Sequence, residues 1–343
     1  MRILAVTNMF PTPDKPVFGI FVARQIEAIR KLGHQVDVEF IRAERSLKPY
    51  ALGIGRVRAR ARSGAFDLVH AHYGLTGFVA AFQPLPLVVS FCGDDLLGTP
   101  DGRGGNTLKS RIGMRLSALA ARRADGIICK SEGLRAALPR HRDRERARVI
   151  GNGVDTGRFS PGDRDQARAR LGVSRDERLV LYPHDRTQWA VKRFDLARAA
   201  IENLGTRRPG VRLWEVSGVS PDAMPDYYRA ADCLLLTSDH EGSPNVVKEA
   251  LCSDLPVVSV DAGDVKRWMS LVPGCVMVER DASAIGEGLA QVLSGPGRVD
   301  GGPVRRVLSS EVVAGEIVAL YNEVVSQPGR RQARMPAVDS AIH

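Results

Sequence analysis

Two glutamates flank a turn whose residue types could bind a phosphate group and a sugar. Glu241 lies just before the turn and Glu249 lies in the helix that we expect to follow it. A buried strand is expected to end at Thr237, after which Ser243 would act as N-cap and Pro244 as the first helical residue. The unpaired amides of that helix start would attract a phosphate or diphosphate. Because a carboxylate only accepts hydrogen bonds, Glu249 suits a ribose diol and Glu241 the hydroxyls of another sugar.

Short apolar runs alternate with amphipathic stretches on both sides of this segment. We expect strands at 2–6, 35–40, 68–71, 87–91, 126–129 and 148–150, and again at 178–182, 211–216, 233–237 and 256–260. Strands separated by helices at this spacing are typical of parallel βαβ units. The sequence therefore predicts an α/β protein built of doubly wound sheets.

The pattern breaks and restarts at a run with turn chemistry, Gly151-Asn152-Gly153-Val154-Asp155. We predict a first domain over 1–155, a second over 156–310, a helix over 311–326 that could cross back to the first domain, and a disordered tail over 327–343. Ligands of open α/β sheets bind beyond the carboxyl ends of the strands, so we expect the active site in a cleft between the two domains.

The composition of the chain limits the kinds of partner and cellular compartment that we expect for it. The 343 residues carry 49 Lys and Arg against 39 Asp and Glu, a net charge of +10, which favours an anionic partner: a phosphate-bearing ligand, an anionic membrane or a nucleic acid. Five scattered cysteines without a CxxC pair argue against a disulfide framework or zinc site and favour a reducing cytoplasm. No apolar run approaches the roughly 20 residues of a membrane span, and the N-terminus is typical of a buried strand rather than a signal peptide.

The segment from Glu241 to Ala250, with Leu255-Pro256-Val257-Val258 after it, resembles the signature of retaining family-four glycosyltransferases with the GT-B fold. Four other segments resemble the same family in the same order: 1–36, 151–161, 192–196 and 224–232. The similarity is greatest to the group that acts in teichuronic-acid and related surface-polysaccharide synthesis. The resemblance implies two Rossmann-like domains that face each other across a cleft.

The resemblance to this family also implies an activity, which is the transfer of a sugar from a nucleotide diphosphate sugar to a hydroxyl acceptor. The anomeric configuration would be retained, and neither metal nor cofactor would be needed. The acceptor would be a surface glycan, a lipid-linked molecule or a small molecule. Lys192 and Arg186 would stabilise the leaving diphosphate, Glu241 would orient the donor sugar, and Glu249 would hold the ribose. The implied site also includes donor-binding residues, which are Gly242, Ser243, Pro244, Asn245, Gly218 and Val219, and first-domain cleft residues, which are Gly19, His72, Cys92 and Asp95.

The chain departs from the family pattern at a turn of the first domain. Cys92 stands where the family carries a histidine, while Asp95 matches the family's aspartate. A thiol does not supply the hydrogen bonds of an imidazole. Either that role is dispensable, or His70 or His72 takes it; a small buried thiol is the ordinary interpretation of Cys92 itself.

Two further departures concern the second domain. Arg186 precedes Lys192 by six residues rather than five, and Arg193 is the first alternative as the second cation. The domain is also shorter by about one βα unit, because the strand at 211–216 leads almost directly to the segment at 224–232. That shortening leaves the nucleobase, and so the nucleotide, undetermined.

Basic stretches occur at 56–62 and 140–146, and the stretch 108–123 fits an amphipathic helix with Leu108, Ile112, Leu116 and Leu119 on one face and cations around it. Two interpretations stay open: peripheral attachment to anionic lipid at the inner face of the membrane, or an ordinary helix packed on its sheet. Nucleic-acid binding is disfavoured, since aromatic residues make up 6% of the chain and none alternates with these arginines.

Two alternative functions can be stated. A Rossmann oxidoreductase or epimerase would carry GxGxxG after the first strand, where this chain has Asn8-Met9-Phe10-Pro11-Thr12-Pro13. A non-catalytic sugar-nucleotide-binding protein of the same fold, degenerate at Cys92, is the stronger rival, and turnover of a nucleotide sugar would distinguish it from an enzyme.

Overall fold

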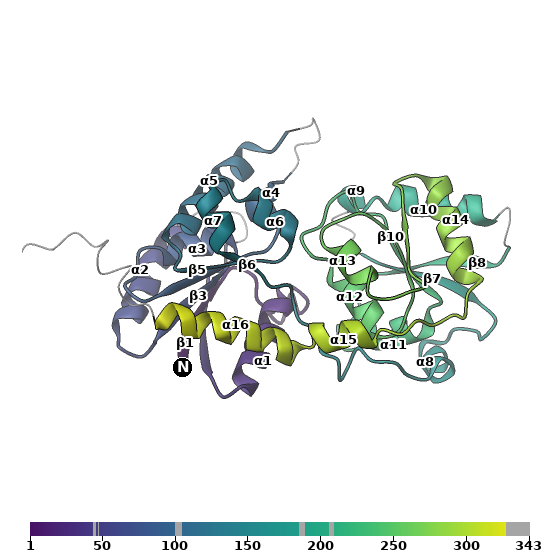
Figure 1. Cartoon of the computed structure of the whole chain (residues 1–343), viewed down its shortest axis with the longest axis horizontal. Helices are drawn as coiled ribbons and strands as arrows, with labels where there is room; N and C mark the ends of the chain where they lie inside the picture. Colours follow the sequence, from purple (N-terminus) through teal and green to yellow (C-terminus); the bar gives the residue numbers. More distant parts are fainter. Residues whose placement is uncertain (44–45, 47, 100–104, 185–188, 206–208, 327–343) are drawn as a thin grey trace, which may run out of the picture. The chain divides into compact units, whose positions relative to one another are not determined.

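Two parallel β-sheets organise the chain in the computed structural model, which describes residues 1–43, 46, 48–99, 105–184, 189–205 and 209–326 (Figure 1). Unit 1 comprises Met1–Pro13, Phe18–Ile150 and Ala314–His343, and unit 2 comprises Asp14–Val17 and Gly151–Val313. The predicted tail at 327–343 lies outside the described residues. Among the helices of the described residues, none is long and apolar enough to cross a membrane.

The sheet of unit 1 has six parallel strands in the order β2-β1-β3-β4-β5-β6. Their bounds are β1 Arg2–Thr7, β2 Gln35–Phe40, β3 Leu68–His72, β4 Leu87–Phe91, β5 Gly126–Cys129 and β6 Ala147–Val149. Every residue of β3, β4 and β5 is buried, because helices cover both faces of a parallel sheet. The predicted strands are confirmed to within one or two residues at their ends.

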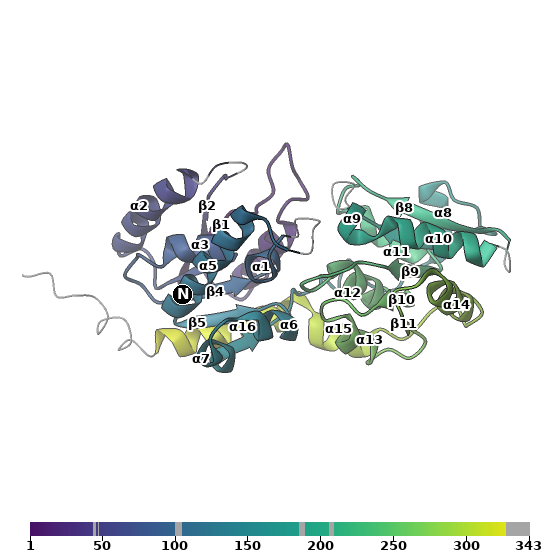
Figure 2. The same ribbon diagram turned by 90° about the horizontal axis from the view of Figure 1, so that it is seen from above.

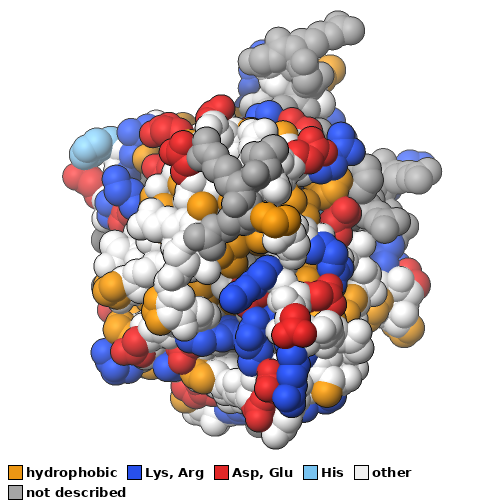
Figure 3. Space-filling view, turned by 90° about the vertical axis from the view of Figure 1, so that its right-hand side faces the viewer, with side chains coloured by type: hydrophobic (Ala, Val, Ile, Leu, Met, Phe, Trp, Pro, Cys, Tyr) orange, Lys and Arg blue, Asp and Glu red, His pale blue; other side chains and the backbone are white. Residues whose placement is uncertain are grey.

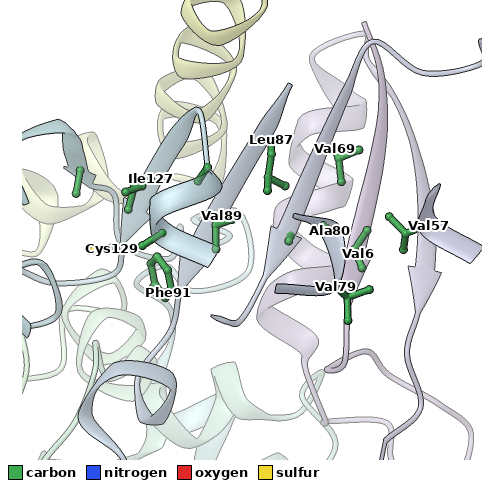
Figure 4. Close-up of a cluster of buried hydrophobic side chains, with 14 of the residues drawn as sticks. Val6, Val57, Val69, Val79, Ala80, Leu87, Val89, Phe91, Ile127 and Cys129 are labelled. Carbon is green, nitrogen blue, oxygen red and sulfur yellow. The ribbon is translucent and has the colours of Figure 1, made fainter. Parts of the chain in front are cut away.

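Helices α1 Ile20–Lys31, α2 Lys48–Arg62, α3 Gly74–Ala80, α4 Asp94–Leu97, α5 Leu108–Arg123, α6 Glu132–Ala137 and α7 His141–Arg146 connect these strands (Figures 1 and 2). The last helix, α16 Ser310–Val325, belongs to unit 1 from Ala314 on. Side chains from the strands and from α2 and α3 form a single apolar cluster, shown in Figure 4, which includes Val6, Val57, Val69, Val79, Leu87, Val89, Phe91 and Ile127. This core fixes the carboxyl ends of the strands, where the predicted first-domain residues lie.

The sheet of unit 2 has five parallel strands in the order β11-β10-β9-β7-β8. Its strands are β7 Arg178–Pro183, β8 Val211–Val216, β9 Cys233–Leu236, β10 Val257–Val260 and β11 Val276–Val278. Its helices are α8 Arg164–Leu171, α9 Trp189–Lys192, α10 Phe194–Gly205, α11 Met224–Ala230, α12 Asn245–Cys252, α13 Val265–Met269, α14 Ala282–Leu293 and α15 Gly302–Leu308. Strand β8 lies at the edge of the sheet, and the chain passes from it through residues 217–223 directly into α11.

Candidate functional site

The loops that follow β7 and β9 are joined by hydrogen bonds around the backbone of Lys192. The carbonyl oxygen of Lys192 accepts hydrogen bonds from the hydroxyls of Tyr182, at 2.6 Å, and Thr237, at 2.8 Å. The amide of Asp239 donates to the carbonyl of Val191 at 2.9 Å. The carboxyl ends of two adjacent strands therefore hold Lys192 in a defined position.

Lys192 forms an ion pair with Glu241, although 49 positions separate them in the sequence. Its Nζ lies 2.5 Å from Oε1 of Glu241, and the hydroxyl of Ser238 donates to the same oxygen at 2.7 Å. Both side chains of the pair are largely shielded from water, with 18% and 15% exposure, which strengthens their attraction. The fold thus brings together two of the three residues predicted to be catalytic.

The third, Arg186, lies outside the described residues, so its role stays a prediction. The alternative cation, Arg193, is held by two carboxylates: its guanidinium contacts Asp195 and Asp239 at 3.1 and 3.2 Å. Hydrogen bonds to these carboxylates, first that to Asp195, raise the pKa of Arg193. Two carboxylates hold Arg193 whereas one holds Lys192, so Arg193 is the less suited of the two cations to a diphosphate.

Arg280 supports the same loop and was not found from the sequence. It follows β11, and its Nη2 donates to the carbonyl oxygens of Ser238, Asp239 and Asp261 at 3.1, 3.2 and 3.3 Å. These bonds connect the loop that precedes Glu241 with the end of β10. A single arginine 39 residues beyond Glu241 carries no local sequence signal of this role.

The predicted cap of α12 is wrong by one residue. Pro244 occupies the N-cap position and α12 begins at Asn245. Ser243 is not the cap, because its hydroxyl donates to Oδ2 of Asp264 at 2.7 Å and accepts from Nζ of Lys248 at 2.8 Å. Since a proline side chain cannot accept hydrogen bonds, the first amides of α12 stay available to an anion.

Lys248 is a buried cation beneath this turn. Its side chain is fully buried, and burial lowers its pKa, an effect opposed by the charge of Asp264. Nζ also donates to the carbonyl of Asn152 at 3.3 Å, and the Asn152 side chain donates to Asn245 at 3.2 Å. The start of α12 is therefore tied to the segment 151–155 that resembled the interdomain element.

Glu249 projects from α12 toward Tyr228 of α11. The Tyr228 hydroxyl donates to Oε2 of Glu249 at 2.9 Å, and the buried Tyr228 ring packs edge-on against Phe159 with centroids 5.8 Å apart. Tyr228 thus orients the carboxylate predicted to hold a ribose.

Gly218 follows β8 with φ of +69°, and a Cβ built there would have no heavy atom within 4 Å. The predicted roles of Gly218 and Val219 at a nucleobase therefore stay predictions.

In unit 1, Gly19 lies in a position that only glycine fits. Its φ is +71°, and a Cβ there would lie 2.3 Å from the carbonyl carbon of Met9. Asp95 is buried and accepts from the amides of Gly74, at 2.9 Å, and Gly93, at 2.8 Å. Burial raises the pKa of Asp95 to about 6 despite these bonds. Burial also raises the pKa of Cys92 to about 12, so its thiol stays protonated at neutral pH and is no nucleophile.

Two histidines lie at the end of β3 in this unit. The Nδ1 of His70 lies 2.5 Å from the Tyr321 hydroxyl, and its Nε2 lies 2.8 Å from the Ser90 hydroxyl. His72 is also buried, and neither of its ring nitrogens has a hydrogen-bond partner among the described residues. Burial, and then the charge of Lys130, lower the pKa of His72 to about 3. His72 is therefore a neutral imidazole with hydrogen-bonding capacity to spare.

Nothing in the described part of the chain forms a group of three or more His, Cys, Asp or Glu side chains suited to a metal ion. In unit 2, the Lys192 ammonium and the first amides of α12 are groups whose charge would suit an anion.

Comparison with known proteins matches both units to glycosyltransferase models. Residues 19–158 match the model described as Glycosyltransferase Family 4, and residues 186–295 match the one described as Glycosyl transferases group 1.

Two curated relatives illustrate the similarity. The chain is 27% identical to D-inositol 3-phosphate glycosyltransferase 1 of Catenulispora acidiphila, over 69% of this chain and 66% of that protein, slightly under two thirds of its length. It is 24% identical to a Bacillus subtilis protein named for teichuronic acid biosynthesis, the glycosyltransferase TuaC, over 85% of this chain and 89% of that one.

Solved structures share the fold over nearly all of the chain. Sucrose-phosphate synthase from Thermosynechococcus elongatus has a TM-score of 0.75 at 18% identity and covers 95% of this chain and 100% of its own. Anabaena Alr3699/HepE, solved in complex with UDP, has a TM-score of 0.65 at 17% identity and covers 94% of this chain and 100% of its own.

Proposed function

This chain belongs to glycosyltransferase family 4 and has its GT-B fold, and from that premise we propose that it transfers a sugar from a nucleotide diphosphate sugar to a hydroxyl acceptor, retaining the anomeric configuration. The observation that carries the proposal is the Lys192–Glu241 ion pair, held at the carboxyl ends of β7 and β9 just before the open start of α12. A cation, a sugar-binding carboxylate and free amides are the groups that such a donor requires.

The leaving diphosphate gains negative charge as the bond to the sugar breaks. Lys192 would share its ammonium between Glu241 and the diphosphate, and the first amides of α12 would donate to the same phosphates. Arg186 is proposed to add a second cation. Charges that strengthen their contact as the bond breaks lower the barrier and do not merely tighten binding.

The two glutamates would position the rest of the donor. Glu249, oriented by the Tyr228 hydroxyl, would accept hydrogen bonds from the ribose diol. Glu241, fixed by Lys192 and Ser238, would orient the hydroxyls of the donor sugar. Gly242, Ser243, Pro244 and Asn245 would shape the phosphate turn, and Gly218 and Val219 would line the base.

Unit 1 is proposed to bind the acceptor. The neutral His72 would supply the hydrogen bonds that the family obtains from its histidine and that the Cys92 thiol cannot. Gly19 would permit close approach of the loop that carries it, and Asp95 would hold the backbone of the turn at Cys92.

We also propose which donor and which acceptor the protein uses. UDP, bound in the Anabaena structure, makes UDP-sugars the first donors to test. A surface-glycan or lipid-linked acceptor agrees with the relative named for teichuronic acid biosynthesis. Five cysteines without a disulfide agree with a reducing cytoplasm, where the protein would attach peripherally to anionic lipid.

A screen of thermal stability against UDP, GDP, CDP and TDP and their sugars tests donor binding. We expect one nucleotide family to raise Tm in a concentration-dependent way, and slow hydrolysis of the matching sugar nucleotide to release a sugar of unchanged anomeric configuration. Stabilisation without any turnover, with or without added acceptors, would favour the non-catalytic binding protein. Failure of every nucleotide to raise Tm would contradict both.

A further inference from the structure

Lys248 is a buried cation of unit 2 that the proposed mechanism does not use. Its side chain is fully buried, and its Nζ donates to two uncharged oxygens, the Ser243 hydroxyl at 2.8 Å and the Asn152 carbonyl at 3.3 Å. Removing an ammonium from water is costly when its partners carry no charge. The position of Lys248 therefore indicates a role other than stabilising the fold.

Exposed cations of unit 2 such as Arg170 contact carboxylates directly. The Arg170 guanidinium lies 2.7 Å from Asp226, and Figure 3 shows a face of the molecule on which basic and acidic side chains lie next to one another. Lys248 instead reaches a carboxylate through the Ser243 hydroxyl, which donates to Oδ2 of Asp264 at 2.7 Å. That hydroxyl thus lies between a cation and an anion, which fix its orientation.

The Asp264 carboxylate that holds this hydroxyl is itself fixed. Its Oδ2 also accepts a hydrogen bond from the indole Nε1 of Trp268 at 2.7 Å. The preceding residue, Gly263, has φ of +67°, and a Cβ built there would lie 3.0 Å from the carbonyl oxygen of Glu241. The loop after β10 therefore packs closely against the turn before α12 and holds the Ser243 hydroxyl in place.

Pro244 lies one bond rotation away from a helical conformation. Its φ is −69° and its ψ is 113°, and only the second value departs from those of an α-helix. A change of ψ to about −40° would make Pro244 the first helical residue, a position that proline favours. Ser243 would then be the N-cap, and its oxygen would accept a hydrogen bond from an amide of the first turn. The start of α12 can therefore adopt a second state, in which Ser243 caps it.

This capped state would compete with an anion. The amides that an N-cap hydroxyl satisfies are the ones that a phosphate at a helix start requires. In the structure no side chain of the described residues caps α12, since Lys248 and Asp264 hold the Ser243 hydroxyl instead. Loss of the Lys248 ammonium would leave the oxygen of that hydroxyl free to turn toward the amides.

We propose that Lys248 is a positioning residue, which keeps the Ser243 hydroxyl away from the first amides of α12 and so keeps these amides open to the donor diphosphate. The inference relies on the proposed function, because that function assigns the diphosphate to the start of α12. A purely structural role of Lys248 would not depend on the hydroxyl of Ser243. The two roles can therefore be separated by removing that hydroxyl.

A double-mutant cycle on the full chain tests this dependence. Lys248→Met, which keeps the length of the side chain and removes its donors, is made both in the wild type and in Ser243→Ala. Calorimetric titration measures the affinity of each protein for UDP, GDP, CDP or TDP, whichever of the four the wild type binds most tightly. Lys266→Met, which replaces an exposed lysine of α13, is the control.

We expect Lys248→Met to weaken binding of the nucleoside diphosphate on the order of tenfold when Ser243 is present, because the ligand must then displace a cap. In the Ser243→Ala background the same replacement should change the affinity by less than about twofold. Affinity for the corresponding nucleoside, which carries no phosphate, should also change by less than about twofold. Lys266→Met should bind the nucleoside diphosphate as the wild type does.

A crystal structure of the Lys248→Met protein should show the capped state directly. We expect α12 to begin at Pro244, with the Ser243 oxygen accepting a hydrogen bond from the amide of Asn245 or Val246. A helix that still begins at Asn245, with its first turn uncapped, would contradict the proposal.

Equal losses of diphosphate affinity in both backgrounds, or no loss when Ser243 is present, would overturn the proposal and leave the proposed function intact. Absence of binding of all four nucleotides to the wild type would instead overturn the proposed function, and this inference with it. Lys248→Leu repeats the cycle if Lys248→Met does not fold. If neither protein folds, the ammonium serves the stability of the fold and the proposal is wrong.

Discussion

At the scale of single residues, the candidate chemistry of unit 2 depends on carboxylates that partners distant in the sequence hold in place. Tyr228 lies 21 positions from Glu249, and Lys192 lies 49 positions from Glu241. A carboxylate whose orientation is already fixed loses less conformational entropy when a ligand hydroxyl binds to it. Replacing Tyr228 or Lys192 should therefore weaken ligand binding or catalysis even if the replaced side chain itself touches no ligand.

Glu249→Ala should weaken binding of the preferred nucleoside diphosphate by about 1.5–3 kcal/mol, the range for hydrogen bonds to a charged group. Tyr228→Phe should cost less, about 0.5–1.5 kcal/mol, since it removes one bond that orients the carboxylate. Calorimetric titration measures both, with the exposed Glu202→Ala as control. A folded Glu249→Ala protein with wild-type affinity would remove Glu249 from the ribose role.

Lys192→Ala should lower kcat/KM by a factor on the order of 10² or more, as does loss of other groups that stabilise transition-state charge. Arg186→Ala should act similarly if the longer loop still delivers its guanidinium to the diphosphate. Arg193→Gln should have a smaller effect, because Asp195 and Asp239 already compensate that charge. Steady-state kinetics on the three variants compares them. If Arg186→Ala stays within about twofold of wild type while Arg193→Gln is strongly impaired, the assignment of the second cation must be reversed.

At the scale of elements, loops after the strands depend on anchors that lie in other loops. The loop 238–241 is held by Arg280 from the end of β11, and the turn at Cys92 by the Asp95 carboxylate. We expect such anchors to position the proposed site residues without touching a substrate.

Arg280→Met should lower kcat by about tenfold or more while the affinity for the nucleoside diphosphate changes little. The reason is that small displacements of a positioned group reduce the rate of reaction strongly. Kinetics and calorimetric titration separate the two effects, and Arg198→Met, at an exposed position of α10, is the control. Equal losses in affinity and rate would indicate that Arg280 contacts the nucleotide itself.

The carboxyl end of β3 should make stability depend on pH. The pKa of His72 is about 3 in the fold against about 6.5 in an unfolded chain, so between these values the unfolded state binds more protons. His70 acts in the same direction. Stability should therefore fall as pH decreases, and His72 contributes about 1.4 kcal/mol per pH unit to that fall. Asp95 acts in the opposite direction, because its pKa is raised in the fold to about 6. Between about pH 6 and 4 it cancels the contribution of one histidine to this loss of stability.

Urea unfolding at several pH values between about 6.5 and 4.5 should show His72→Gln gaining on wild type as pH falls, by about 1.4 kcal/mol per pH unit. The exposed His141→Gln should keep a constant difference from wild type. A constant difference for His72→Gln as well would mean that His72 titrates normally in the fold.

At the scale of the whole molecule, the charges that we propose to face a diphosphate come from the chain itself. Lys192 and the amides of α12 are present before any ligand binds, and Arg186 would add to them. Such fixed groups can neutralise a leaving diphosphate without a divalent ion.

Sugar transfer should therefore survive excess EDTA, with kcat/KM within about twofold of the untreated enzyme. A coupled assay of nucleoside diphosphate release, before and after EDTA treatment, measures this. Loss of activity that magnesium or manganese restores would contradict the metal-independent mechanism.

Much of the architecture was predictable because it depends on local patterns. Continuous apolar runs such as those of β3, β4 and β5 occur only where both faces of a strand are covered, and the helix at 108–123 was located at both ends from its periodicity. The resemblance around Glu241 and Glu249 was similarly local, since a strand end, a turn and a helix start within 14 residues suffice to present it.

The tertiary structure decided what each side chain contacts. Lys192 pairs with Glu241, and Lys248 donates to the Ser243 hydroxyl. Arg280 supports the loop before Glu241, and Tyr228 orients Glu249. No periodicity in the sequence relates the two positions of any of these contacts. Periodicity likewise located the apolar stripe of α5, which includes Leu108, Ile112 and Leu119, but not the direction in which it points, which is toward solvent. The direction of the apolar stripe follows from how closely the backbones of α3 and α5 approach. Gly74 and Gly77 of α3 leave room only for the small side chains on one face of α5.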